Sequence, residues 1–339
     1  MIRGKRDLIA NVCAATGATS LCEHFPRKPV LMVLNYHRIG DFESTEYDPG
    51  SFSCTAAEFD WQIGYFKRHY RTTTLDEVLD LLRRAVPLAE PRVLFTFDDG
   101  YIDNYQFAFP VLRRHGVQGV FFLPTAFTGT GRIPWWDTIA YIVKRSQRST
   151  FRLDYPRSQE FDLTASGIDE GTMRILRLYT QPEMQDHERF LENLERACES
   201  SRPGGETSRC FLDWNEAREM LAGGMAFGSH THNHEILSKL PARDQVEELR
   251  LSREIMEGEL HRKIDTLAYP VGAQETFSSE TMDALQQTKY RAAFSFYGGF
   301  NRTDSVAAFD IRRCGVERPT RKRLRLQATL GSLTGSVWF

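Results

Sequence analysis

The chain contains no long run of apolar residues and no long run of like charge. No stretch approaches the roughly eighteen apolar residues that a membrane-spanning helix needs. The formal net charge is −2, from 43 lysine and arginine residues against 45 aspartate and glutamate residues, so we expect no nucleic-acid partner. Two short basic stretches, Arg312-Arg313 and residues 318–325, are interpreted as solvated surface rather than as a site for a polyanion.

Cysteine is sparse and scattered. None of the six cysteines forms a CxxC pair, and none lies beside the histidine cluster described below. A thiolate metal site is therefore not expected, and single cysteines of this kind are typical of small buried residues in a reducing compartment. Their even number leaves disulfides open. We expect a cytoplasmic protein.

The N-terminal segment, residues 1–29, resembles a weak signal peptide because basic residues precede a moderately apolar stretch. Asp7 borders that stretch, however, and Leu8, Ile9 and Val12 follow helical spacing. We expect a helical extension that lies either on the protein or at a membrane surface, so peripheral membrane contact is possible. Export through a weak signal is the alternative.

Beyond residue 30, apolar strand-like segments alternate with helix-like segments. With 41% hydrophobic and 26% charged residues in 339, the chain can bury a large core. The strand-like runs cover residues 30–36, 92–97, 117–123, 225–228, 266–269 and 292–295; the helix-like runs cover residues 56–70, 75–82, 105–114, 188–198, 214–221, 241–260 and 282–287. Such alternation predicts an α/β fold with a parallel sheet.

The regular alternation is interrupted at about residues 128–212, where we expect a partly helical insertion within a barrel domain that spans residues 30–339. Trp135-Trp136 opens the insertion. Exposed Trp faces would stack on sugar rings, and a buried pair would instead anchor the insertion. Polar motifs that follow strand ends favour a (β/α) barrel, in which chemistry occurs at the carboxyl ends of the strands.

The first such motif is Thr96-Phe97-Asp98-Asp99-Gly100. Two adjacent carboxylates at the end of a strand repel each other unless a cation lies between them. One of them could bind a metal while the other accepts a proton. An ordinary Asp-Gly turn is the alternative.

The second motif, residues 228–234, contains His230, His232 and His234, three of the nine histidines of the chain. On a helical turn, residues four apart lie on one face, so His230 and His234 could bind one ion while His232 points elsewhere. A polar loop with a chance cluster is the alternative, although imidazole is a very common metal ligand.

A third segment, Ala268-Tyr269-Pro270-Val271-Gly272, follows a strand-like run. Proline and glycine fix an irregular backbone there, which could direct an N–H group into a site. Taken alone, this segment is more typical of an ordinary turn.

Together these segments resemble the polysaccharide deacetylase family, also called the NodB homology family or carbohydrate esterase family 4. Its TFDDG motif is found at residues 96–100, its H-[ST]-x-x-H motif at 230–234, and its Pro-aromatic-Gly motif is approximated at 270–272. The resemblance covers roughly residues 30–125 and 210–315. It implies a distorted, seven-stranded (β/α) barrel.

Two features depart from the usual pattern of the family. No arginine is apparent upstream of Pro270, and no histidine follows His261, so the C-terminal L-x-H motif is missing. Leu34-Asn35-Tyr36-His37 looks like that motif moved to the N-terminus, an order that resembles a subgroup acting on biofilm exopolysaccharide. Because the first and last strands of a closed barrel are neighbours, His37 could reach the same site. A core histidine is the alternative.

The resemblance implies a role for each matching residue. Asp99, His230 and His234 would bind a divalent metal, Zn²⁺ above all, with Asp98 as the base and His37 as the acid. The substrate would be an N-acetylated polysaccharide or glycolipid precursor. We expect Tyr101, Tyr269, Pro270 and Val271 to contact this substrate. The alternatives are another amide hydrolase or deformylase on the same scaffold and an inactive glycan-binding protein.

Overall fold

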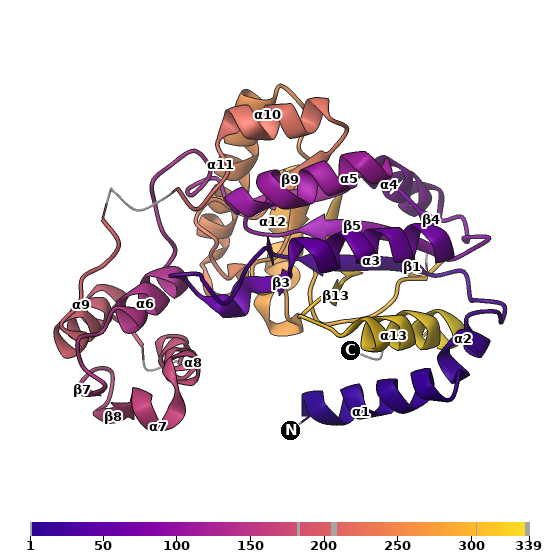
Figure 1. The fold of residues 1–339 in the computed structure, drawn as a ribbon. Helices are drawn as coiled ribbons and strands as arrows, with labels where there is room; N and C mark the ends of the chain where they lie inside the picture. Colours follow the sequence, from indigo (N-terminus) through magenta and orange to yellow (C-terminus); the bar gives the residue numbers. More distant parts are fainter. Residues whose placement is uncertain (1, 182–183, 205–208, 303, 336–339) are drawn as a thin grey trace. The chain divides into compact units, whose positions relative to one another are not determined.

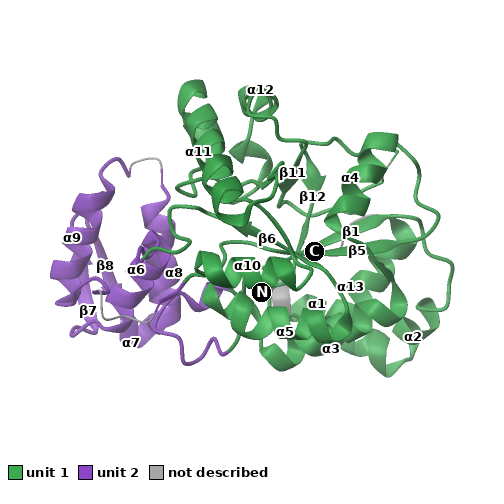
Figure 2. Cartoon of the chain, turned by 90° about the horizontal axis from the view of Figure 1, so that it is seen from above, with its two compact units in different colours: residues 1–40, 52–130, 211–339 green, residues 41–51, 131–210 purple. Residues whose placement is uncertain are grey.

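The computed structural model describes residues 2–181, 184–204, 209–302 and 304–335. The chain forms two compact units (Figure 2). Unit 1 comprises residues 1–40, 52–130 and 211–339, and unit 2 comprises residues 41–51 and 131–210. The division expected from the sequence, an extension at 1–29 and a 30–339 domain with an insertion at about 128–212, stays a prediction.

Unit 1 is built on a parallel sheet that curls into a nearly closed barrel (Figure 1). The spatial order of its strands is β12 (Ile311–Arg312), β11 (Ala292–Ser295), β10 (Thr266–Ala268), β9 (Ala226–Ser229), β6 (Gly119–Leu123), β5 (Arg92–Phe97), β1 (Leu31–Tyr36) and β13 (Cys314–Gly315), with β4 (Arg71–Thr72) also paired to β5. The two strands at the ends of this path, β12 and β13, are consecutive pieces of one segment, because only Arg313 separates them. That segment pairs with β11 on one side and β1 on the other, so seven segments complete the barrel and the predicted fold class is confirmed.

Alternate side chains of the strands point to opposite sides of the barrel wall, as the two-residue period of a strand requires. In β1, Met32 and Leu34 belong to a cluster that includes side chains of the covering helices. Leu31 and Val33 belong instead to a cluster contributed by strands from all around the barrel and by residues 75–79. Both faces of the sheet are therefore buried, which explains why β1 reads as a continuous apolar run.

The helices of unit 1 pack around the barrel, and residues 75–79 of one of them join the cluster of inward-facing strand side chains. They are α3 (Ala56–His69), α4 (Leu75–Arg84), α5 (Phe109–His115), α10 (Trp214–Ala222), α11 (Ala242–Leu260), α12 (Ser279–Gln287) and α13 (Arg321–Thr334), preceded by α1 (Ile2–Ala15) and α2 (Ala18–Cys22). The helix expected at 105–114 is divided into η2 (Asn104–Ala108), one turn of π-helix, and α5, which ends at left-handed Gly116. Shorter elements are β2 (Arg38–Ile39), β3 (Phe52–Cys54), η1 (Pro49–Ser51), η3 (Leu237–Lys239) and η4 (Gln274–Thr276).

Unit 2 has a small core of its own. It consists of α6 (Trp135–Lys144), α7 (Leu163–Ser166), α8 (Ile168–Tyr179) and α9 (His187–Cys198), with an antiparallel hairpin of β7 (Thr150–Leu153) and β8 (Gln159–Asp162). Trp135 stacks on Tyr179 with ring centroids 4.5 Å apart and packs against this core. The position of Trp135 therefore agrees with the anchoring alternative rather than with an exposed sugar platform.

Residues 318–325 are only partly the solvated stretch that the sequence suggested, because Arg321 and Lys322 are exposed whereas Arg323 is not. Helix α13 begins at Arg321, and its Arg323 is buried, with Nη2 donating to the carbonyl oxygens of Glu317 and Arg318. Arg321 and Arg325 form ion pairs with Glu58 and Glu23. The basic residues of this stretch thus attach α13 to the rest of unit 1, which a count of charges could not reveal.

Candidate metal centre and active site

Three groups of side chains meet at the carboxyl ends of the barrel strands. Asp98 and Asp99 follow β5, His230 follows β9, and His37 follows β1. Because these strands are parallel, their carboxyl ends lie at the same rim. Residues almost two hundred positions apart in sequence are thereby brought to one place.

Asp99, His230 and His234 form a cluster that could bind one metal ion. One ligand atom from each residue lies within 4.8 Å of the other two. Asp99 Oδ1 is 3.6 Å from His230 Nε2 and 3.4 Å from His234 Nε2. Two ligands about 2.1 Å from a tetrahedral zinc ion are about 3.4 Å apart. The donor types and their spacing therefore fit zinc, with room for further ligands.

The protonation states of the cluster suit a cation. Burial alone would raise the pKa of the Asp99 carboxyl, but the hydrogen bond with His234 and the nearby imidazoles hold this pKa well below its usual range. Burial lowers the pKa of His230 to about 4, so its ring is neutral at pH 7. The cluster thus presents one carboxylate and a neutral imidazole with a free electron pair, as a metal ligand must.

Neighbouring groups orient the His230 ring. Its Nδ1 atom donates to the carbonyl oxygen of Ala268, 2.8 Å away at the end of β10. This bond places the proton on Nδ1 and leaves the Nε2 lone pair directed at Asp99. Metal-binding histidines almost always have such a partner on the other ring nitrogen, which fixes the tautomer and the ring orientation.

The histidine segment is a loop after β9 and not the helical turn that the sequence suggested. Thr231 and His234 have φ angles of 64° and 61°, in the left-handed region that residues other than glycine rarely adopt. Glu248 of α11 accepts hydrogen bonds from the backbone N–H groups of His232 and Asn233. These contacts hold the loop so that His230 and His234 converge without helical periodicity.

His232 contacts another part of the site. Its Nδ1 atom is 2.8 Å from Thr125 Oγ1, and it does not belong to the three-residue cluster. This placement separates it from the two histidines on either side.

Asp98 is buried beside the cluster and is held by several side chains. Its Oδ1 accepts a 2.7 Å hydrogen bond from Arg313 Nη1, and its Oδ2 accepts a 3.0 Å bond from Asn35 Nδ2. Burial alone would raise the pKa of the Asp98 carboxyl, but the charge and hydrogen bond of Arg313, together with the nearby imidazoles, outweigh burial and lower the pKa. Asp98 is therefore a carboxylate at neutral pH.

Arg313 corrects a second expectation from the sequence. It was interpreted as part of a solvated basic stretch, but its side chain is fully buried and forms an ion pair with Asp98. Nη1 also donates to Asn35 Oδ1 at 2.7 Å, and Nε donates to the carbonyl oxygen of Ser295. No arginine was found upstream of Pro270, but Arg313, between β12 and β13, binds the Asp98 carboxylate instead.

Replacing Arg313 with methionine should destabilise the protein by about 3–5 kcal/mol, because the Asp98 carboxylate would remain buried without its cation. Urea unfolding of the full chain measures this change. The neighbouring Arg312 is exposed, and Arg312→Met should change the free energy of unfolding by less than about 1 kcal/mol. Equal effects of the two substitutions would contradict the assigned role of the Arg313–Asp98 pair.

His37 lies at the same rim. Its Nε2 atom is 4.0 Å from Asp98 Oδ2, and 30% of its side chain is exposed to solvent. The backbone N–H of His37 donates to Ser53 Oγ, and its ring contacts the edge of the Phe296 ring. A partly exposed imidazole next to a buried carboxylate can exchange protons with a bound molecule.

The four residues expected to contact substrate differ in their exposure to solvent. Tyr101 is fully buried and stacks on Phe211, and Tyr269 is buried with its hydroxyl donating to the carbonyl oxygen of Phe309. Both phenols are covered by protein side chains, and their contact with substrate stays a prediction. Pro270 is also buried, whereas Val271 is 54% exposed with φ 63°. Of this group, only Val271 presents its side chain to solvent.

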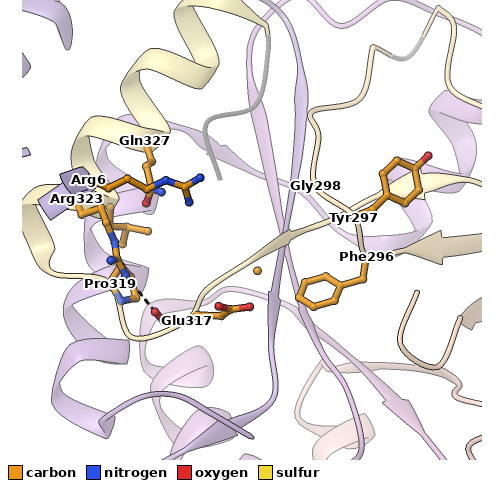
Figure 3. Close-up of a pocket in the computed structure, with 10 residues that line it drawn as sticks. Arg6, Phe296, Tyr297, Gly298, Glu317, Pro319, Arg323 and Gln327 are labelled. Atoms are coloured by element: carbon orange, nitrogen blue, oxygen red, sulfur yellow. Dashed lines mark hydrogen bonds between the residues drawn. The ribbon is translucent and has the colours of Figure 1, made fainter. Parts of the chain in front are cut away.

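A pocket of about 440 Å³ is lined by Phe296, whose ring also contacts His37. Figure 3 shows Arg6, Glu317 and Phe296 directed into it from three separate segments. Arg6 forms no ion pair with any residue that the structure describes, so its guanidinium is available to a bound molecule. The pocket combines an aromatic ring with polar groups, which is typical of sites that bind sugars. No sequence motif indicated it.

Comparisons with known proteins agree with this architecture. The profile of the family described as Polysaccharide deacetylase matches residues 85–152 and 169–293. The Bacillus subtilis protein YxkH is described as a polysaccharide deacetylase by similarity. It is 22% identical over 261 residues, which cover 77% of this chain but only 62% of YxkH. The match therefore spans less than two thirds of that relative.

Two solved structures have a similar fold. IcaB from Ammonifex degensii matches with a TM-score of 0.57 and 20% identity over 90% of this chain and 98% of its own. The Streptococcus pyogenes deacetylase PplD, solved in complex with acetate, matches with a TM-score of 0.56 and 18% identity over 88% of this chain and 97% of its own. At these identities the likeness establishes a common fold.

Proposed function

The chain belongs to the polysaccharide deacetylase family, and from this premise we propose that it is a metal-dependent hydrolase that removes N-acetyl groups from the amino sugars of a glycan. The observation that carries the proposal is the ionised, arginine-bound Asp98 immediately beside the three-ligand cluster of Asp99, His230 and His234. A protein that only binds glycans needs no buried carboxylate next to a metal site. Metal-assisted hydrolysis of an amide uses both, the metal to polarise the carbonyl and the carboxylate to accept a proton.

Asp99, His230 and His234 would hold the metal, for which zinc is the best match to two imidazoles and one carboxylate. A zinc ion bound there supplies a Lewis acid that polarises the acetamide carbonyl and lowers the pKa of water. The protein supplies everything else: the ligand geometry, the proton acceptor and the proton donor.

Asp98 is proposed to accept the proton of the attacking water. Arg313 and Asn35 fix the direction of the carboxylate, so that little reorganisation is required when the proton is transferred. The lowered pKa of Asp98 ensures that this residue is unprotonated when the substrate binds. Arg313 and Asn35 act as positioning residues.

His37 is proposed to donate a proton to the departing amine. An amine is a poor leaving group unless it is protonated, and a histidine can supply the proton at neutral pH. The partial exposure of His37 supports this role, because the donor must reach the substrate. A backbone N–H near Val271 is proposed to donate a hydrogen bond to the developing oxyanion.

The pocket beside His37 is proposed to hold the sugars that flank the acetylated one. Phe296 would provide an apolar surface for a sugar ring, and Arg6 and Glu317 would form hydrogen bonds with hydroxyl groups. The substrate would then be an oligosaccharide or longer glycan, either free or in a glycolipid precursor. A cytoplasmic location of the protein stays a prediction.

A panel of N-acetylated oligosaccharides of increasing length tests this function. We expect the full chain with zinc to release acetate from them, faster from trimers and longer chains than from the monosaccharide. A chelator should abolish the release, and added zinc should restore it. Acetate release that continues unchanged after complete removal of metal would contradict the proposal.

A further inference from the structure

Helix α1 packs against the protein through its less apolar face. Ala10 of this face is buried, and Asp7 accepts hydrogen bonds from Thr320 and Arg323 of the α13 region. On the same side, Asn11 accepts a hydrogen bond from Lys322. Figure 1 shows α1 lying along α13. The contact that holds α1 in place is therefore largely polar.

The large apolar side chains of α1 and α2 point to solvent instead. Ten large apolar residues are prominently exposed in the described part of the chain, and half of them lie within eighteen consecutive residues. These five are Leu8 (64% exposed), Ile9 (43%), Val12 (54%), Leu21 (64%) and Phe25 (53%). An amphipathic helix of a globular protein normally buries its apolar stripe. In α1 the orientation is reversed, and we call these five residues, of which Phe25 follows the end of α2, the apolar face.

The charges around the apolar face are mainly basic, because the pocket that Phe25 lines contains Arg27, Arg68 and Arg71 against Glu23 and Glu90. Lys5 is exposed near Leu8 and Ile9, one turn earlier on the same side of the helix. The acidic residues of the segment, Asp7 and Glu23, are both engaged by the protein, through Arg323 and Arg325 respectively. Glu90, which lines the pocket beside Phe25, is paired with Arg71. Exposed apolar side chains with neighbouring cations and ion-paired carboxylates suit the surface of an anionic membrane.

We propose that the apolar face of α1 and α2 binds the surface of a membrane that contains anionic lipids. Among the described residues, no helix is long and apolar enough to cross a membrane, so the helices would lie in the interface. Leu8, Val12 and Phe25 would enter the boundary between headgroups and acyl chains, and Lys5 would contact lipid phosphates. This proposal does not depend on the proposed function.

Sedimentation of the full chain with lipid vesicles tests it. We expect binding to vesicles of phosphatidylcholine with phosphatidylglycerol, and at least tenfold weaker binding to phosphatidylcholine alone or in high salt. Leu8→Gln combined with Val12→Gln should weaken binding to the anionic vesicles at least tenfold. The two residues lie one turn apart on the exposed side of α1, so their replacement leaves the contact with α13 intact.

Ile168→Gln combined with Met173→Gln provides the matched control, because these residues are also exposed apolar side chains (44% and 47%) but lie in unit 2. The control should bind vesicles as well as the unchanged protein does. Acetate release from a short oligosaccharide should be the same in all three proteins, which separates failure of this proposal from failure of the proposed function.

Three outcomes would overturn the proposal. The unchanged protein could fail to bind anionic vesicles, or the Leu8/Val12 variant could bind them equally well. Alternatively, the unchanged protein could be a dimer that the Leu8/Val12 variant dissociates, with no vesicle binding. That result would show that a second copy of the chain covers the apolar face.

Discussion

Asp98→Asn should lower acetate release by about 10²- to 10⁴-fold, the usual contribution of a positioned general base, while zinc stays bound. Asparagine has nearly the shape of aspartate but cannot accept the proton at this step. The metal should remain because the ligand atoms of the cluster come from Asp99, His230 and His234. Acetate release and the zinc content of the same preparation together measure the two parts of this prediction.

The buried position of Asp98 requires a control for stability. Asp98→Asn leaves the Arg313 guanidinium buried without its carboxylate, which lowers the free energy of unfolding. Adding Arg313→Met removes the unpaired cation, so the double variant should regain part of the lost stability but none of the activity. Activity that recovers together with stability would show that Asp98 has only a structural role.

His230→Ala should remove both the metal and the activity. The substitution removes one of the three ligands. The ring of this ligand is buried and is oriented by its hydrogen bond to Ala268. Loss of an outer partner of a ligand already weakens metal binding by about 10- to 100-fold, so loss of the ligand itself should weaken it by more than a hundredfold. Zinc titration with a competing chelator measures the affinity.

His232→Ala is the matched control for this experiment, because His232 lies in the same loop but contacts Thr125. It should keep zinc affinity within a few-fold of that of the unchanged protein. If His230→Ala and His232→Ala weakened zinc binding equally, disturbance of the loop and not loss of a ligand would be the cause.

The position of the site was predictable from the sequence, since Asp98 and Asp99 end one apolar strand and His230 follows another. Parallel strands bring their carboxyl ends together whatever their separation in sequence. The mode of convergence of His230 and His234 was not predictable. It depends on left-handed backbone at Thr231 and His234 and on hydrogen bonds to Glu248 of α11, the next α-helix, and residue spacing reports neither.

The two-residue period of the strands also determines the side-chain directions of Tyr269 and Arg313. Tyr269 follows Ala268, whose side chain joins the strand cluster of the barrel, and therefore points outward to α12 and neighbouring elements. Its burial away from the site follows from that alternation. Arg313 is two residues after Ile311, which belongs to the same strand cluster, so the alternation places Arg313 inside. Because this segment is short and follows a loop, its strand character was not evident and the arginine was taken for surface.

The exposure of the apolar face could not be predicted from the sequence. Helical spacing correctly predicted a helix that includes Leu8 and Val12. Periodicity shows that a helix has two unlike faces but does not say which one the protein covers. That depends on α13, whose polar contacts with Asp7 and Asn11 select the other face.

Zinc K-edge X-ray absorption of the zinc-loaded full chain would show whether Asp99, His230 and His234 bind one divalent cation. We expect one zinc per chain with two imidazole nitrogens and oxygen ligands at about 2.0–2.1 Å, and one imidazole fewer in His234→Ala. A zinc bound by cysteine sulfur, or an imidazole signal unchanged by His234→Ala, would contradict it.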